Sequence, residues 1–291
     1  MARSFDLAAL TSLRLLDELT TIVSRAAAAI LLMDPRTVTR RAKPDLTPVT
    51  AADEVSNEEI IKGLSCLLPG LPIVSEESME VSGAAHIGRS FVLVDPLDGT
   101  REFLAGRDEF TVNLALVIDG IPVVGLIAAP ALGFVWRGIV GRTAERLRLS
   151  AGATAEKAAE IVVIRTRRRP TDGLVAAVSR SHFDAETEAL LARLPVKTQI
   201  ACGSSIKFCQ IAEGGADLYA RLAPTHEWDI AAGHAIVTAA GGVVMSPEGK
   251  PVTYGGLAEG FVVPAFLAFG DPEMANAIPI PAGQSAWRRG C

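Results

Sequence analysis

The sequence predicts an α/β protein whose helices and sheets pack in layers. The chain has 291 residues, of which 49% are hydrophobic, and this is enough apolar surface for one large domain or two. Strand-like and helix-like segments alternate through residues 173–245. The first half instead combines helix-like patterns with a run of strands typical of an antiparallel sheet.

The N-terminal half opens with helical periodicity. Apolar residues recur at helical spacing through residues 7–30, which predicts one amphipathic helix packed on the body of the protein. The prolines of residues 44–48 predict an irregular loop. Thr50 is expected to cap a second helix that ends near Leu67.

Strands follow these two helices. Asp119 and Gly120 form a dipeptide typical of a hairpin turn, so the apolar run around them predicts two or three antiparallel strands. The strand-like segments of this half are residues 71–75, 90–96 and 111–140.

The second half predicts alternating elements, and a polar, alanine-rich segment at residues 141–160 marks the expected division into subdomains 1–150 and 151–291. The predicted strands are 173–181, 197–203, 216–222, 242–245 and 259–270, and the predicted helices are 185–194, 204–214 and 229–241.

Composition excludes several classes of protein. The net charge of −5 offers no dominant positive field for nucleic acid. The four cysteines form no CxxC pair, so a disulfide framework or a zinc ribbon is not expected. We expect reduced thiols in a cytoplasmic protein instead. Acidic residues interrupt the N-terminal segment, so it lacks the continuous apolar centre of a signal peptide. The uncharged stretch 26–33 is too short to span a bilayer. Peripheral association with the inner membrane stays open.

A pair of carboxylates follows the strand at residues 90–96. Asp95 and Asp98 flank a short turn in which Pro96 fixes one torsion and Gly99 permits a sharp bend before a helix start. Like charges this close need a cation or a raised pKa, and oxygen ligands select hard cations such as Mg²⁺. The alternative is an ordinary turn, since Asp-Pro and Asp-Gly are common turn dipeptides.

Three further acidic residues can join this group. Glu76 ends the preceding strand, where the alternative is a solvated Glu pair with Glu77. Asp229 precedes a predicted helix and can equally be its N-cap. Asp53 lies in the first turn of a helix, where compensation of the helix dipole would also explain it.

Four segments in this order resemble the inositol-monophosphatase-like superfamily of Mg²⁺-dependent, lithium-sensitive phosphatases. They are TPVTAAD at 47–53, EE at 76–77, DPLDGTREF at 95–103 and WDIAAG at 228–233. The resemblance implies a layered α/β/α/β/α sandwich of the inositol-monophosphatase and sugar-phosphatase type, with the site in the cleft between two subdomains. It also implies two or three Mg²⁺ ions.

The resemblance assigns roles residue by residue. It implies that Asp53 and Thr100 activate the attacking water, with Asp53 holding the Thr100 hydroxyl or accepting its proton. The implied ligands are Glu76, Asp95 and the Leu97 carbonyl for one metal, and Asp95, Asp98 and Asp229 for a second; Glu76, Gly99 and Thr100 also match substrate-binding positions.

The segments VSRSH at 178–182 and GSSIK at 203–207 resemble the 3′(2′),5′-bisphosphate nucleotidase branch, the CysQ-type enzymes. In that branch the positions of Ser179, His182, Gly203 and Lys207 touch the nucleotide. Without this resemblance, His182 reads as a surface residue and Lys207 as a solvated one.

The implied substrate is 3′-phosphoadenosine 5′-phosphate, a by-product of sulfate assimilation, which is hydrolysed to AMP and phosphate. The rival hypothesis within the superfamily is an inositol monophosphatase or sugar-bisphosphatase using the same metals. A non-catalytic nucleotide or metal sensor is the hypothesis from another class. The sequence leaves a monomer and a homodimer equally open.

Overall fold

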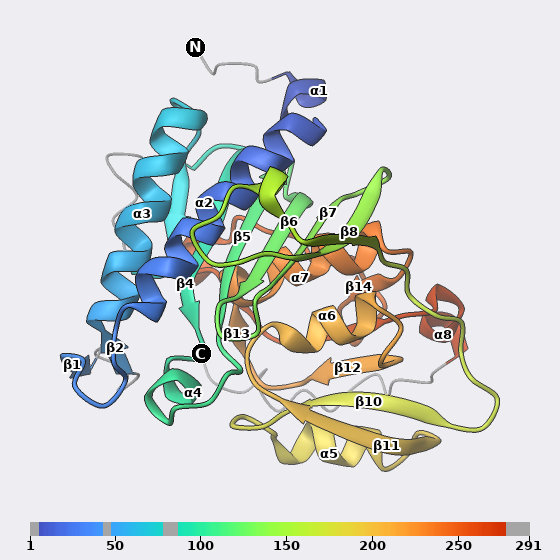
Figure 1. Cartoon of the computed structure of the whole chain (residues 1–291). Coiled ribbons are helices and arrows are strands. Elements are labelled where there is room, and N and C mark those ends of the chain that lie inside the picture. Colours follow the sequence, from blue (N-terminus) through green and yellow to red (C-terminus); the bar gives the residue numbers. More distant parts are fainter. Residues whose placement is uncertain (1–5, 43–47, 78–86, 278–291) are drawn as a thin grey trace.

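The computed structural model describes residues 6–42, 48–77 and 87–277, and two sheets dominate it (Figure 1). The larger sheet has seven strands in the order β3-β4-β5-β6-β7-β8-β9, with β3 and β4 parallel and all other neighbours antiparallel. Its strands are β3 (Ile73–Ser75), β4 (Ser90–Asp98), β5 (Thr111–Ile118), β6 (Ile121–Ala129), β7 (Phe134–Ile139), β8 (Thr143–Arg148) and β9 (Glu160–Val163).

The second sheet has five strands in the order β11-β10-β12-β16-β14, parallel among the first three and antiparallel around β16. These are β10 (Leu174–Ser179), β11 (Val196–Cys202), β12 (Leu218–Arg221), β14 (Val243–Met245) and β16 (Phe266–Phe269). Two small antiparallel pairs complete the strands: β1 (Arg40–Ala42) with β2 (Pro48–Thr50), and β13 (Thr225–His226) with β15 (Val262–Val263).

The helices form three layers around the two sheets, so the expected α/β/α/β/α sandwich is confirmed (Figure 1). α2 (Leu13–Leu31) and α3 (Ala51–Leu67) cover the outer face of the seven-stranded sheet, and α6 (Ile206–Ala212) and α7 (Glu227–Ala239) lie between the sheets. α5 (Ala185–Leu191) and α8 (Pro272–Ala277) pack beside the five-stranded sheet. The short helices are α1 (Leu7–Leu10), α4 (Thr100–Leu104) and two 3₁₀ turns, Ala155–Lys157 and Leu257–Glu259.

β4 shows why the sheet strands are apolar on both faces. Successive side chains of a strand point to opposite faces. Phe91 and Leu93 join the core between the sheets, whereas Val92 and Val94 join the core under α2 and α3. A strand covered on both faces therefore reads as a continuous apolar run.

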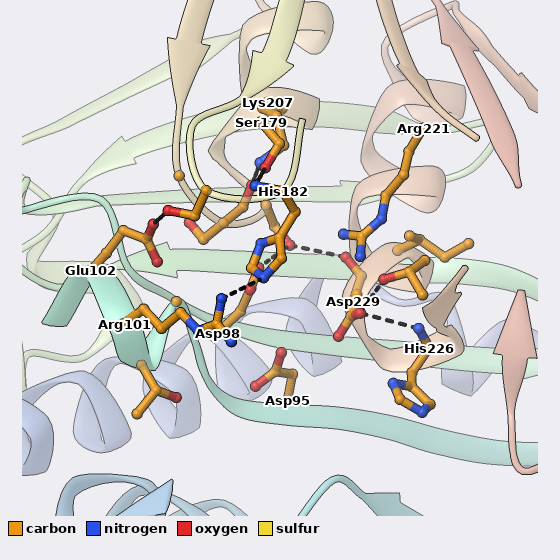
Figure 2. A pocket seen from close by; sticks show the side chains of 18 of the residues that line it. Asp95, Asp98, Arg101, Glu102, Ser179, His182, Lys207, Arg221, His226 and Asp229 are labelled. Carbon is orange, nitrogen blue, oxygen red and sulfur yellow. Dashed lines mark hydrogen bonds between the residues drawn. The ribbon is translucent and has the colours of Figure 1, made fainter. Parts of the chain in front are cut away.

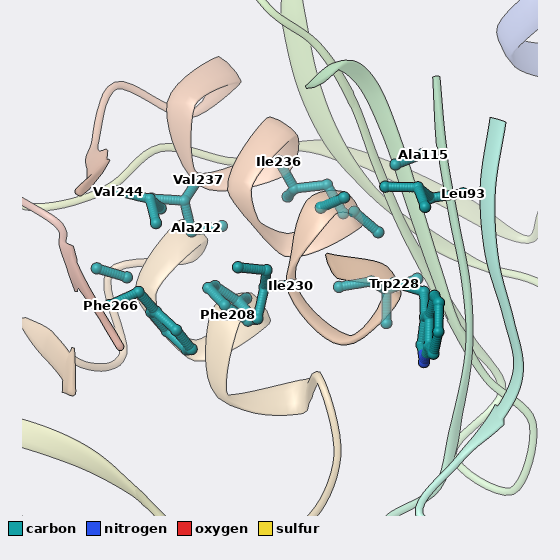
Figure 3. Close-up of a cluster of buried hydrophobic side chains, with 14 of the residues drawn as sticks. Leu93, Ala115, Phe208, Ala212, Trp228, Ile230, Ile236, Val237, Val244 and Phe266 are labelled. Carbon is teal, nitrogen blue, oxygen red and sulfur yellow. The ribbon is translucent and has the colours of Figure 1, made fainter. Parts of the chain in front are cut away.

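The core between the sheets is built around α6 and α7 (Figure 3). Phe208 of α6 stacks on Phe266 of β16, with ring centroids 5.4 Å apart and planes 19° apart. On the other side, Trp228 and Ile236 of α7 belong to the same cluster as Leu93 of β4. The two central helices therefore pack against both sheets.

Two predicted elements are corrected by the structure. The predicted helix over residues 7–30 is two helices, because Ser12 caps a new helix by accepting a hydrogen bond from the Leu15 amide at 3.1 Å. The predicted final strand over 259–270 is split into β15 and β16. Pro264 lies between them and has no N–H to donate to a ladder.

Other boundaries agree with the prediction. Thr50 caps α3, which ends at Leu67, and both residues of the hairpin turn have positive φ: 54° at Asp119 and 75° at Gly120. The seven-stranded sheet continues to Val163, past the expected division at residue 150, and the division into two subdomains stays a prediction. Among the described residues, no helix combines the length and the apolarity that crossing a bilayer requires.

Candidate active site

Two neighbouring strand ends bring the first carboxylates together. β3 and β4 are parallel, with Ser75 opposite Val94, and the Glu76 amide donates to the Val94 carbonyl at 3.1 Å. Glu76 therefore lies beside Asp95. Carboxylate oxygens of Glu76, Asp95 and Asp229 all lie within 4.8 Å of one another, which is close enough for a shared cation.

The turn after Asp95 is held from several sides. The Leu97 amide donates to the Asp95 carboxylate at 3.1 Å, and the Ser56 hydroxyl of α3 donates to the Pro96 carbonyl at 2.7 Å. Gly99 has a φ of 91°, in the left-handed region that favours glycine. The chain therefore reverses at this point and enters α4 directly.

Asp98 is bound to residues from both halves of the chain. Its carboxylate accepts hydrogen bonds from the Ser205 hydroxyl at 2.9 Å and the Asn113 amide at 3.4 Å. Asn113 Nδ2 also donates to Ser205 Oγ at 2.8 Å, and that hydroxyl lies 3.0 Å from the main-chain oxygen of Asp229. Ser205 therefore joins two of the predicted metal ligands.

Asp229 lies within the first turn of α7, which corrects the expectation that it precedes the helix as an N-cap. The N-cap is His226, and its amide donates to Asp229 Oδ2 at 3.1 Å. The Thr225 hydroxyl donates a short hydrogen bond to the same oxygen. Asp229 thus has one oxygen bound to the protein, and its carboxylate remains part of the cluster with Glu76 and Asp95.

Asp53 and Thr100 also meet. Thr100 Oγ1 lies 3.1 Å from Asp53 Oδ1 and 3.2 Å from the Leu97 carbonyl oxygen, so its single proton has two acceptors. The other Asp53 oxygen accepts from the amide and the hydroxyl of Thr50, both at 2.7 Å. These bonds fix the buried Asp53 side chain with Oδ1 toward Thr100.

Burial and mutual repulsion make these carboxylates costly without a cation. Burial, followed by repulsion from Glu76 and then Asp98, raises the pKa of Asp95 well above its usual value. Burial and the charge of Asp229 raise the pKa of Asp98 to about 6. The donors are all carboxylate or carbonyl oxygens, so the residues present fit Mg²⁺.

The acidic cluster lines a pocket that basic side chains also line (Figure 2). Lys207, Arg101 and Arg221 line it together with His182. Arg101 Nη1 lies 3.3 Å from His182 Nε2. Partial burial, then the charges of Arg221 and Arg101, lowers the pKa of His182 and so favours its neutral imidazole. The pocket therefore combines clustered carboxylates, which suit a metal ion, with basic side chains, which suit an anion.

Comparison with known proteins agrees with this geometry. The model of the inositol monophosphatase family matches residues 14–277. This protein belongs to the inositol monophosphatase family. The expected superfamily is thereby confirmed.

Individual relatives of this family member include the 3′(2′),5′-bisphosphate nucleotidase CysQ of Escherichia coli strain K12. It is 39% identical over 213 residues, which are 73% of this chain and 82% of that protein. The crystal structure of CysQ from Bacteroides thetaiotaomicron superposes with a TM-score of 0.70 at 32% identity, over 87% of this chain and 95% of that one. An inositol monophosphatase from Anabaena has the same fold, with a TM-score of 0.71 at 22% identity over 94% and 98%.

In this family member the four residues predicted to touch a nucleotide all line the pocket, and their contact with a nucleotide stays a prediction. Ser179 Oγ accepts a hydrogen bond from the His182 amide at 3.0 Å, which closes the turn after β10. Lys207 Nζ donates to the carbonyls of Cys202 at 3.3 Å and Ser204 at 2.5 Å. The Gly203 amide donates to a carboxylate rather than pointing to open space.

Sequence reasoning missed several residues that build the site of this family member. Asn113 could have been found, because it is a buried polar residue in an otherwise apolar strand. Thr225 and Ser205 were not predicted as site residues, because their partner carboxylates become visible only in three dimensions. Arg101 and Arg221 had no local signal beyond their charge.

Proposed function

We propose that the chain is a Mg²⁺-dependent phosphatase that removes the 3′-phosphate of 3′-phosphoadenosine 5′-phosphate, giving AMP and phosphate. The observation that carries this proposal is one pocket that joins three clustered carboxylates to a set of basic side chains. The 3′(2′),5′-bisphosphate nucleotidase name of the relatives supports the same reaction class. Clearance of a by-product of sulfate assimilation would be its role.

Glu76, Asp95 and the Leu97 carbonyl would hold one ion, and Asp95, Asp98 and Asp229 a second. Bound Mg²⁺ supplies neutralisation of the phosphoryl charge and acidifies water. Two or three ions are proposed in total. All five of these residues line the same pocket.

The Asp53–Thr100 contact supports an enzyme rather than a passive sensor. When the Thr100 hydroxyl donates to Asp53 Oδ1, its oxygen lone pairs are free to accept a hydrogen bond from an attacking water. Asp53 then receives the proton or balances its charge, since threonine alone is a weak base. Burial raises the pKa of Asp53, and this brings it closer to the range useful for proton transfer.

A bisphosphate substrate needs cations at two places. The metal end would receive the 3′-phosphate, and the 5′-phosphate would require positive charge elsewhere in the pocket. Lys207, Arg101 and Arg221 supply it, and the neutral His182 ring offers a flat surface for a base. A plain inositol monophosphate would leave this second cationic group without an anion, which favours a bisphosphate substrate over inositol monophosphate.

Substrate choice is tested by kcat/KM on 3′-phosphoadenosine 5′-phosphate, inositol 1-phosphate and fructose 1,6-bisphosphate at one Mg²⁺ concentration. We expect the nucleotide to be preferred by at least tenfold. A higher value for either other ester would overturn the proposed substrate while leaving the phosphatase chemistry intact.

The catalytic pair is tested by Asp53→Asn. This variant keeps the side-chain shape but removes the acceptor charge, so we expect Mg²⁺ binding to persist and phosphate release to fall at least a hundredfold. Normal turnover in the variant would refute the role of Asp53.

A cytoplasmic location, lithium sensitivity and a monomeric or homodimeric state stay predictions.

A further inference from the structure

We infer that Glu109 is a positioning residue that fastens both predicted nucleotide-binding segments to the metal-binding turn. The inference rests on the proposed function, because these segments form the same pocket. Glu109 lies in the loop between α4 and β5, and it comes ten residues after Gly99 in the chain. No role for it follows from the motifs alone, since it reads in sequence as a solvated acid.

The Glu109 carboxylate binds both segments at once. Arg180 donates two parallel hydrogen bonds to it, from Nε at 2.8 Å and from Nη2 at 2.7 Å. The Gly203 amide donates to Oε2 at 2.9 Å. A two-pronged pair between arginine and a carboxylate fixes orientation as well as distance. One side chain of the seven-stranded half thereby sets the positions of residues 179–182 and 203–207.

The main chain of Glu109 packs between two glycines. A Cβ atom added to Gly203 would lie 2.7 Å from the Glu109 carbonyl oxygen, and one added to Gly99 would lie 3.2 Å from it. The first distance is shorter than real Cβ contacts allow. Both glycines were predicted as substrate contacts, and the structure gives each a second reason: Gly203 permits the close approach of Glu109, and Gly99 combines a tight contact with a φ of 91°.

Arg180 consequently acts through Glu109 rather than on a ligand. Its Nη2 also donates to the Ala201 carbonyl at 2.6 Å, so the guanidinium is engaged by main chain and carboxylate together. Ser179 and His182 line the pocket on either side of it in sequence. Holding Arg180 therefore sets where these two side chains stand relative to the metal-binding turn.

Loss of this junction should loosen substrate binding more than it slows the chemical step. Glu109→Gln keeps the size of the side chain but removes the charge from three hydrogen bonds. We expect KM for 3′-phosphoadenosine 5′-phosphate to rise about tenfold, and kcat to change less than threefold, because the Asp53–Thr100 pair does not touch Glu109.

A matched control lies in the five-stranded half of the protein. Asp172 and Lys197 form an ion pair of the same 2.7 Å length, but their side chains are 69% and 60% exposed, against 26% for Glu109 and 37% for Arg180. Asp172→Asn should leave KM within twofold of the unchanged protein. A rise of KM in Glu109→Gln no larger than in this control would overturn the inference.

The pair itself is tested by combining Glu109→Gln with Arg180→Met. If the two residues act as one junction, the double variant should raise KM little beyond either single variant, whereas independent effects would multiply and refute the junction. Equal losses of kcat and of Mg²⁺ affinity in Glu109→Gln would show general damage to the turn and would also count against positioning.

A failure of the proposed function can be told apart from a failure of the positioning role of Glu109. If the unchanged protein prefers inositol 1-phosphate, the nucleotide assignment is wrong, and the same KM comparison is then made with that ester. An unchanged KM for it in Glu109→Gln would refute the positioning role independently, and a raised KM would support it.

Discussion

Replacing Ser205 by alanine should weaken the proposed metal site without changing a predicted metal ligand. The buried Ser205 hydroxyl lies 2.9 Å from Asp98 Oδ2 and accepts from Asn113 at 2.8 Å. A hydrogen bond to a charged group contributes about 1.5–3 kcal/mol. Its loss lets Asp98 rotate away from Asp229, and removal of such supporting residues lowers metal affinity about 10–100-fold. We therefore expect about 30-fold weaker binding, equivalent to about 2 kcal/mol.

The measurement is the Mg²⁺ concentration that gives half-maximal phosphate release at pH 7.5. Ser204→Ala is the control, because the Ser204 hydroxyl has no hydrogen-bond partner among the described residues and its loss should shift this concentration less than threefold. The reasoning fails if Ser205→Ala shifts the half-saturating concentration no more than Ser204→Ala does.

Three further predictions concern pH, a buried ion pair and the central core. Asp98 has a pKa of about 6 in the folded protein, against an ordinary value of 3.8, so the folded state binds its proton more tightly. In the presence of a metal chelator, the unchanged protein should lose thermal stability relative to Asp98→Asn as pH rises from 4 to 7, measured as the melting temperature. A gain in this pH window would contradict the raised pKa of Asp98. Mg²⁺ affinity should rise over the same window because the ion needs the ionised form. Arg137 is buried against Asp17 and Glu145, so Arg137→Met should lower the free energy of unfolding by about 3 kcal/mol, whereas the same change at exposed Arg89 should cost under about 0.5 kcal/mol; equal urea midpoints would refute this. Phe208→Ala should cost about 3–5 kcal/mol in urea unfolding, since its ring packs on Phe266 and Tyr219, and a loss under about 1 kcal/mol would show that the cavity collapses.

Much of the site was predictable because its signals are local. Pro96 and Gly99 predict the turn at Asp95 and Asp98, and Thr50 predicts the start of α3. The neighbouring ends of parallel strands then place Glu76 beside Asp95. Each of these inferences uses residues close in sequence or a general rule of sheet geometry.

The remainder depends on contacts that no local pattern specifies. Asn113 and Ser205 are 92 residues apart, and Glu109 and Gly203 are 94 apart. The break between α1 and α2 is different, because it rests on a local capping hydrogen bond from the Leu15 amide to Ser12. The sequence prediction missed it because the apolar spacing continues across Ser12.

The central position of α7 links the proposed cation site to thermal stability. Its first turn carries Asp229, while Asp95 belongs to the seven-stranded sheet, so an ion held by both would cross-link two layers that must separate when the chain unfolds. An ion present at a hundred times its dissociation constant adds about 2.7 kcal/mol to the folded state. Under the proposed Mg²⁺ assignment, magnesium shortage would therefore lower the thermal stability of this protein as well as its activity.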